Sequence, residues 1–286
     1  MKDNKKIIEI PDRSFELSQT ARYTLVFRFI PDGFCFIIFN GLENKVLYFA
    51  EITEKNKDLF ILFKKNATKL PVLKKKFKKI FFIWDTTLYT LLPDSIFEKE
   101  NVTKCWKLNF GELNEQTHSL FSDKLKLQNI VNIYAIPLNI VNLVTEIFPS
   151  VRFLNQQSIH IISSLFECRR ENSSRVYLQI HPDFFDALLI QQGKLMLANS
   201  FRFQNTDEFL YFAINLFEQF HLNQYETTVV LSGEIGNSDP KVKALQRYLD
   251  TIVFKKLSVE ILGINPEKTG NSTRYINLFN LPVCVS

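Results

Sequence analysis

The sequence predicts an α/β protein made of two similar halves. A pattern of three short apolar strands separated by tight turns occurs twice, and alternating helical and strand patterns follow each copy. The chain of 286 residues is 46% apolar, which is enough for two compact halves, each with its own core.

The first copy of the strand pattern lies near the N-terminus. Its turns contain Pro31-Asp32-Gly33 and Asn40-Gly41, residues that supply a fixed or positive φ between apolar runs. The predicted strands are 23–30, 34–39 and 46–52. A helix at about 56–65 and an apolar strand at 80–84 are expected to follow.

The second copy begins after residue 174. Its turns contain Pro182-Asp183 and Gln192-Gly193, and its predicted strands are 175–180, 185–190 and 195–203. Placing Pro31 over Pro182 aligns the apolar strand that follows each proline. The two copies therefore predict an internal duplication.

A helix with a wide apolar face should follow the second copy. Asn205, with Glu208 three residues later, resembles a capping box. The face at helical spacing predicts a buried helix and consists of Phe209, Phe212, Ala213, Leu216, Phe217 and Phe220. A strand at 228–231, a helix that begins at Asp239-Pro240 and runs to Ile252, and a last strand at 259–262 complete this half.

The first half contains an additional segment. Residues from about 93 to 127 look inserted, and a strand at 131–136 and helices at 138–148 and 158–167 come after them. We therefore expect the first half at 1–170 and the second at 171–286. Three antiparallel strands followed by helix, strand, helix and strand is a ribonuclease-H-like order. Two such units in tandem predict an actin-like fold.

Several stretches also resemble a bacterial family of unknown function, typical of Bacteroidota, whose members have an actin-like ATPase fold. They are Phe27-Arg28-Phe29-Ile30-Pro31-Asp32-Gly33-Phe34, the segment 89–97, Ile133-Tyr134-Ala135-Ile136-Pro137 and the segment 275–281. The chain is more distantly similar to the actin homologues of pilus assembly and bacterial cell division. The resemblance implies a fold and assigns no activity.

The turns that bind phosphate in active members of the actin-like superfamily are altered. Such members typically carry an Asp-x-Gly turn at the first hairpin of each half, where the acid holds magnesium. Here the acid position falls on Arg28 or Phe29 in the first half and on Gln179 or Ile180 in the second. A degenerate nucleotide cleft would therefore contain Arg28, Asp32, Gln179, Asp183, Ser232 and Gly233. Ser232-Gly233 follows a strand, as an adenosine-binding segment would, although an ordinary turn is the favoured interpretation.

Other acids offer alternative sites. Asp32, Asp183 and Asp186 are candidates for displaced metal ligands, but Asp32 and Asp183 fit better as turn residues that bond their own backbone. Asp85 follows the strand at 80–84 and is either a catalytic base or a cap for the next segment.

Other catalytic templates are absent from the sequence. It contains no P-loop, no GxGxxG and no GxSxG motif. Its four histidines have no i, i+4 partner, and its four cysteines are far apart without zinc spacing, which favours structural histidines and buried thiols. We expect no metal site and no resident cofactor. ATP with magnesium would at most bind without turnover.

The net charge of +5 is a mild excess, and its one dense block runs from Lys74 to Lys79. A nucleic-acid or anionic-membrane patch is one interpretation of the block, and a solvated helix end is the favoured one. The N-terminus has no apolar signal region, and no apolar run is long enough to span a membrane, which predicts a cytoplasmic protein.

Three functions remain open at this level. The leading hypothesis is a non-catalytic scaffold, a pseudo-ATPase that binds another protein. The second is a divergent ATPase or kinase that uses displaced acids such as Asp32 and Asp183. The third is a nucleic-acid-associated factor that uses the block from Lys74 to Lys79.

Overall fold

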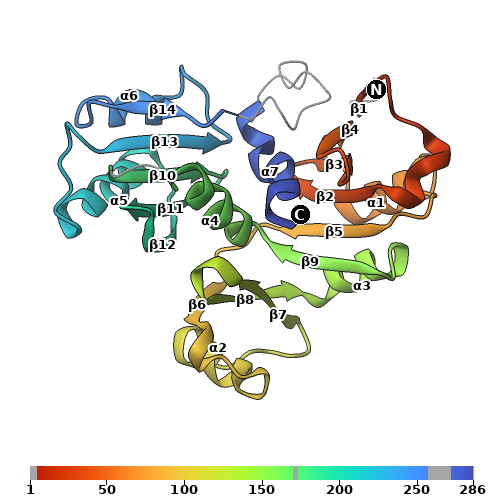
Figure 1. Ribbon diagram of the computed structural model, residues 1–286, viewed down its shortest axis with the longest axis horizontal. Coiled ribbons are helices and arrows are strands. Elements are labelled where there is room, and N and C mark those ends of the chain that lie inside the picture. Colours follow the sequence, from red (N-terminus) through yellow and green to blue (C-terminus); the bar gives the residue numbers. More distant parts are fainter. Residues whose placement is uncertain (1–4, 170–172, 257–271, 286) are drawn as a thin grey trace. The chain divides into compact units, whose positions relative to one another are not determined.

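The computed structural model describes residues 5–169, 173–256 and 272–285 (Figure 1). Apart from Val285, these residues form two compact units, one ending at Ser158 and the other running from Ile159 to Cys284. The boundary between the units follows Ser158, whereas the sequence predicted a boundary after residue 170. Short 3-10 turns occur at Leu17–Arg22, Asp94–Ile96, Lys99–Asn101, Lys126–Gln128 and Ser272–Tyr275.

The main sheet of the first unit has the order β1-β4-β3-β2-β5-β9. Its strands are β1 (Lys5–Pro11), β2 (Thr24–Ile30), β3 (Gly33–Asn40), β4 (Lys45–Glu54), β5 (Lys79–Trp84) and β9 (Val151–Asn155). The predicted meander is confirmed as the antiparallel strands β2, β3 and β4. β5 then pairs parallel to β2, and β9 parallel to β5. The edge strand β1 was not expected, because its sequence mixes lysine, glutamate and isoleucine without a long apolar run.

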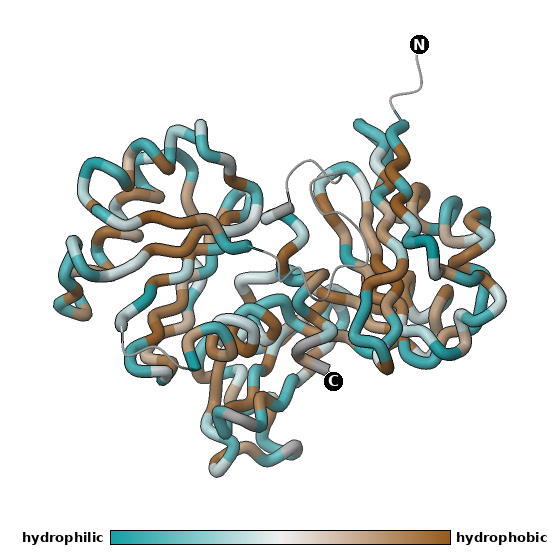
Figure 2. Tube along the Cα trace, turned by 45° about the horizontal axis from the view of Figure 1, so that its top comes forward, coloured by the Kyte–Doolittle hydropathy of each residue, from teal (hydrophilic) through white to brown (hydrophobic). Residues whose placement is uncertain are grey.

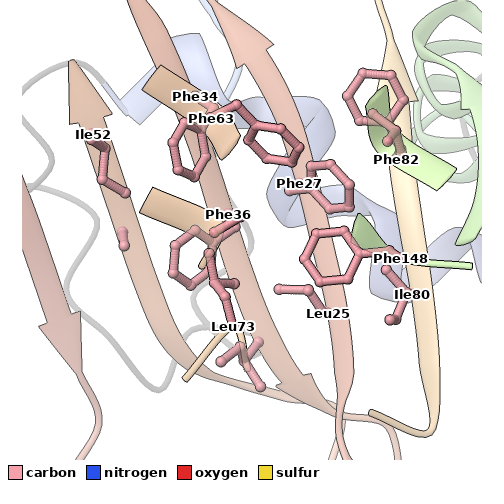
Figure 3. Packing of buried hydrophobic residues seen from close by; sticks show 14 of the residues in the cluster. Leu25, Phe27, Phe34, Phe36, Ile52, Phe63, Leu73, Ile80, Phe82 and Phe148 are labelled. Carbon is pink, nitrogen blue, oxygen red and sulfur yellow. The ribbon is translucent and has the colours of Figure 1, made fainter. Parts of the chain in front are cut away.

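Two helices cover one face of this sheet. They are α1 (Leu59–Ala67) and α3 (Leu138–Ile147), and both contribute side chains to the main apolar cluster. Figure 3 shows aromatic rings from the strands gathered with Phe63 and Phe148 over the sheet. Asp58 begins α1 by accepting a hydrogen bond from the backbone N–H of Ile61 at 3.0 Å.

A separate three-stranded sheet lies in the same unit. It has the order β6-β8-β7 and consists of β6 (Tyr89–Pro93), β7 (His118–Leu125) and β8 (Ile130–Pro137), with helix α2 (Val102–Phe110). Trp106 of α2 packs with Val131, Ile133 and Ala135 in its own small core. The strand expected at 131–136 exists, but it pairs here and not in the main sheet. β9 takes the main-sheet position, because an apolar strand pattern does not specify which neighbour the strand pairs with.

The second unit repeats the connectivity of the first. Its sheet has the order β12-β11-β10-β13-β14. The strands are β10 (Arg175–Ile180), β11 (Phe184–Gln191), β12 (Lys194–Arg202), β13 (Thr228–Gly233) and β14 (Ile252–Phe254). The helices are α4 (Gln156–Glu167), which begins in the first unit, α5 (Thr206–Gln219), α6 (Pro240–Leu245) and α7 (Ile276–Val285). The strand expected at 259–262 lies outside the described residues.

The apolar face predicted for α5 is correct in part. Phe209, Leu216 and Phe217 are buried against the sheet, whereas Phe212 and Phe220 are half-buried. Asn205 caps the helix by accepting from the N–H of Glu208 at 2.9 Å. Helix α6 ends earlier than expected, at Leu245, and Ile252 lies on β14.

Details of strand pairing support the duplication. The β3–β4 pair shifts register between Ile38 and Phe39, and the β11–β12 pair shifts between Leu189 and Ile190, at the same distance in sequence from Pro31 and Pro182. Figure 2 shows hydrophobic residues concentrated along the central strands of both units. The two halves therefore share connectivity and a local irregularity that the hydrophobic pattern does not require.

Candidate functional site

The hairpin of the first unit places three polar or titratable side chains in one row. Arg28 on β2 pairs with Cys35 on β3, and Cys35 pairs with Glu51 on β4. All three are buried, with exposed fractions of 5% or less. They alternate along their strands with members of the aromatic cluster, so the row lies on the opposite face of the sheet.

Arg28 forms an ion pair with Asp85. Its Nη2 atom lies 2.6 Å from Oδ2 of Asp85, the residue that directly follows β5. The side chains are 5% and 19% exposed, so the pair is largely shielded from water. A charge-assisted hydrogen bond of this length orients the carboxylate toward the guanidinium. Asp85, expected as a base or a cap, is thus the partner of the arginine at the altered acid position.

Asp32 lies at the exposed tip of the same hairpin. It has a φ of 62°, and its carbonyl oxygen accepts from the N–H of Glu54 at 2.9 Å. A Cβ atom on the adjacent Gly33 would lie only 2.0 Å from the carbonyl oxygen of Ile52. The glycine therefore permits the close approach of β3 to β4. This turn has a structural explanation that requires no bound phosphate.

The second unit has a corresponding row. Ser200, Asp186, Gln179 and Ser232 are paired in register across β12, β11, β10 and β13. Asp186 is fully buried, and Gln179 and Ser232 are nearly so. Gln179 stands at the same distance from Pro182 as Arg28 does from Pro31. Both predicted acid positions therefore lie at equivalent places in the two sheets.

A hydrogen-bond network surrounds Asp186. Its Oδ2 atom is 3.0 Å from Nε2 of His181, and its Oδ1 atom accepts from the hydroxyl of Ser200. Gln179 reaches the same ring nitrogen of His181 at 3.3 Å, and the ring stacks on Phe184 with 4.1 Å between centroids. Helical i, i+4 spacing does not reveal this partnership, because the hairpin brings together two residues that are five apart in the sequence. A period-two reading of the hairpin would have found it.

Asp183 does not belong to this network. Its Oδ2 atom pairs with Nη1 of Arg202 at 2.8 Å, and both side chains are more than 60% exposed. Its carbonyl oxygen accepts from the N–H of Phe203 at 3.1 Å. Asp183 is therefore an exposed residue of the turn, and its carboxylate bonds Arg202, whereas the sequence favoured a bond to its own backbone.

The turn after β13 is held by hydrogen bonds from within its own unit. Gly233 has a φ of +89°, and a Cβ atom there would lie 2.1 Å from the carbonyl oxygen of Ile180. The carbonyl of Gly233 accepts from the hydroxyl of Thr273 at 3.1 Å, and Arg274 pairs with Glu234 at the same distance. Glycine is thus required here by conformation and by close packing.

A second buried cluster surrounds Lys255, which follows β14. Its Nζ atom lies 3.2 Å and 3.0 Å from the hydroxyls of Ser163 and Ser164 on α4, and 5.1 Å from the ring centroid of Tyr177. Burial lowers the pKa of Lys255, and burial followed by the charges of Lys255 and His181 lowers the pKa of His160 well below its usual value. The sequence analysis predicted a structural role for His160. No pattern in the sequence indicated that Lys255 would be buried.

The remaining sequence predictions concern metal sites, cysteines, the lysine block and membrane-spanning helices. Across the described residues, no group of three or more His, Cys, Asp or Glu side chains could hold a metal ion. Cys35 and Cys168 are buried, and Cys105 and Cys284 are half-buried. The lysines from 74 to 78 lie in the loop between α1 and β5, so the expected helix end is wrong: α1 already stops at Ala67. Among the described helices, none is both long and apolar enough to cross a membrane.

Two sheets with this strand order define a duplicated ribonuclease-H-like architecture, the actin-like ATPase fold. A Bacteroides thetaiotaomicron protein with this fold and unknown function superposes with a TM-score of 0.80 at 21% identity, over 94% of this chain and 99% of that one. A chain of a PilM–PilN type IV pilus biogenesis complex gives 0.58 at 9% identity, over 91% and 96%.

The family follows from the sequence match. The chain belongs to the family described as "Protein of unknown function (DUF3822)", whose model matches residues 12–252. No curated protein matches the chain. The resemblance to a family of unknown function with an actin-like fold is thereby confirmed.

Proposed function

We propose that this chain is a non-catalytic actin-like protein that works by binding another protein. One observation carries the proposal: the residue at the first acid position, Arg28, is buried and ion-paired with Asp85 at 2.6 Å. A cation stands where a magnesium-binding acid would be needed, and its charge is already balanced by the nearest strand-end carboxylate. The position can therefore neither attract a metal ion nor offer Asp85 as an unpaired base.

The second acid position supports the same conclusion. Gln179 is neutral and buried beside His181, while the nearby carboxylate of Asp186 is engaged by His181 and Ser200. Phosphoryl transfer depends on positioning and on a metal ion that neutralises the developing charge. Each missing contact of this kind typically costs roughly 10²–10³ in rate. Two altered positions would thus reduce turnover to background.

The protein-binding part of the proposal rests on the fold. The neighbour in the PilM–PilN complex shows that a chain of this architecture can be found assembled with a protein partner. We propose the same mode of use here, in the cytoplasm. A fractionation experiment in which the protein follows the membranes would contradict this location.

The enzyme question is tested with purified full-length protein. We expect no magnesium-dependent release of phosphate from ATP above background, with calorimetry measuring binding of Mg-ATP separately. Asp32→Asn and Asp183→Asn serve as probes, because both residues are exposed and neither is needed for the core. Activity abolished by either change would overturn the proposal and make the displaced acids catalytic. Activity unaffected by both would be assigned to a contaminant.

A further inference from the structure

Two hollows lie next to each other on the first unit. The larger, of about 730 Å³, is formed by the C-terminal end of α1, the loop that follows it and the residues after α3. The smaller, of about 400 Å³, lies between α1 and α3 and includes Phe60, Ile61 and Leu143. Both are lined by Lys64 and Glu146, whose Nζ and Oε1 atoms are 2.5 Å apart. The hollows therefore form one groove along α1 and α3, bridged by this ion pair.

About half of the residues that line the groove are apolar. Leu73, Phe77, Ile147 and Phe148 contribute to the larger hollow, and Ile61 in the smaller one is 60% exposed. Ile61 lies on a helix that otherwise packs into the core. A bound partner could bury the apolar surface of Ile61. Leu73 and Phe148 are buried, so the accessible apolar side chains are Phe77 and Ile147 in the larger hollow and Ile61 in the smaller one.

The loop end of the groove is strongly basic. Lys74, Lys75 and Lys76 line the larger hollow and are exposed, and no carboxylate in the described part of the chain pairs with them. The only acid that lines either hollow, Glu146, is already paired with Lys64. The groove therefore carries a net positive charge beside apolar surface, which is complementary to acidic residues interspersed with apolar ones.

We propose that this groove binds an acidic segment of a partner protein, whose apolar side chains lie along α1 and α3 and whose carboxylates meet Lys74, Lys75 and Lys76. The proposal rests on the protein-binding function above and names the surface and the chemistry of the partner. A protein segment is favoured over nucleic acid, because a nucleic-acid strand needs cations along its length and accessible aromatic faces for stacking. Here the lysines gather at one end, and Phe77 is only half-exposed.

The test uses a displayed library of random peptides selected against the full-length protein. We expect the enriched peptides to combine Asp or Glu with Leu, Ile or Phe, and their labelled synthetic copies to bind in fluorescence anisotropy. The triple change of Lys74, Lys75 and Lys76 to Glu should weaken binding about tenfold or more. Ile61→Asp, at an exposed position, should weaken it to a similar extent through the apolar part.

A matched control carries the same change of charge elsewhere. Lys55, Lys104 and Lys243 are exposed and line neither hollow, so their triple change to Glu should leave the affinity within about twofold. Circular dichroism checks that all variants are folded.

The outcomes separate the groove from the proposed function. Peptides that bind equally well to the groove variants would overturn the groove assignment and leave protein binding intact elsewhere on the chain. A library that enriches no binder would overturn both. Labelled single-stranded RNA that binds the wild type, loses affinity in the lysine variant and ignores Ile61→Asp would assign the groove to nucleic acid instead.

Discussion

The two halves of the molecule agree in their aromatic cores and differ in their buried polar rows. Phe34 on β3 meets Phe63 of α1 edge-on, with centroids 5.0 Å apart, and Phe185 on β11 meets Phe209 of α5 edge-on at 5.1 Å. Phe34 and Phe185 occupy equivalent places after Pro31 and Pro182. The strand–helix contact that supports each half has therefore been kept across the duplication.

The polar rows show the opposite behaviour. Four positions correspond between the two rows, if the first row is extended to Ile83 of β5, which pairs with Arg28. The corresponding residues are Glu51 and Ser200, Cys35 and Asp186, Arg28 and Gln179, and Ile83 and Ser232. No position in the row carries the same residue in both halves. The first row is joined to Asp85 by an ion pair, whereas the second holds its carboxylate within the sheet through His181 and Ser200. The shared strand register preserves the packing on the face of each sheet that the helices cover. It does not determine which side chains occupy the opposite face.

The largest expected effects test the shared core. Phe63→Ala and Phe209→Ala should each lower the free energy of unfolding by about 3–5 kcal/mol, because both rings are fully buried and leave a cavity. Phe217→Ala should behave similarly, and the half-buried Phe212→Ala should cost less. Urea denaturation measures all four. A loss below about 1 kcal/mol at Phe63 or Phe209 would mean that the two contacts are not equivalent supports.

Changes at the acid positions should separate the rows. Arg28→Gln, which gives the first row the side chain of the second, leaves the partly shielded Asp85 without its guanidinium partner and should cost about 3 kcal/mol. Gln179→Ala removes a neutral contact and should cost about 1–2 kcal/mol.

A double-mutant cycle sharpens this prediction. Adding Asp85→Asn to Arg28→Gln should recover part of the loss, since the carboxylate that lost its guanidinium partner is then removed as well. Additive losses would show that the 2.6 Å ion pair contributes no coupling free energy.

Acid should affect the two halves in opposite directions. Burial raises the pKa of Asp123, on β7 of the first unit, from 3.8 to about 6. Between about pH 4 and 6 the folded state then holds a proton that the unfolded state has released. The free energy of unfolding should therefore fall, by up to about 3 kcal/mol, as the pH rises through this window, and stay level above it.

His160 in the second unit gives the reverse slope. Burial, with the charges of Lys255 and His181, lowers its pKa well below 6.5, so only the unfolded state takes up a proton just below that pH. Stability should fall as the pH drops below about 6.5, by at most about 1.4 kcal/mol per pH unit. Denaturation from pH 4 to 8 of Asp123→Asn and His160→Gln measures each contribution. Identical pH profiles for the wild type and either variant would rule out that group as a source.

The smallest expected effects concern the helix caps. Asp58 caps α1 and Asn205 caps α5 through the same contact, a side-chain oxygen that accepts from the N–H three residues later. Asp58→Ala and Asn205→Ala should each cost about 1 kcal/mol. Losses that differ by more than about 1 kcal/mol would show that the two helices depend differently on their caps.

The meanders, the helices α1, α3 and α5, and the duplication could be predicted from the sequence. These features depend on local properties: turn residues with a preferred φ, apolar periods of two and 3.6, and side chains that can cap a helix. The absence of an acid just before Pro31 and Pro182 could also be read from the sequence, because it depends only on which residues occupy those positions.

The partners of the buried polar side chains could not be predicted and follow from the tertiary structure. It paired Arg28 with Asp85 and enclosed Lys255 among hydroxyls of α4. It also placed β8 in the small sheet, because an apolar strand can be buried against more than one neighbour. Such contacts join residues that are far apart in the sequence, and their distances follow from the packing of separate elements, which no local pattern in the chain encodes.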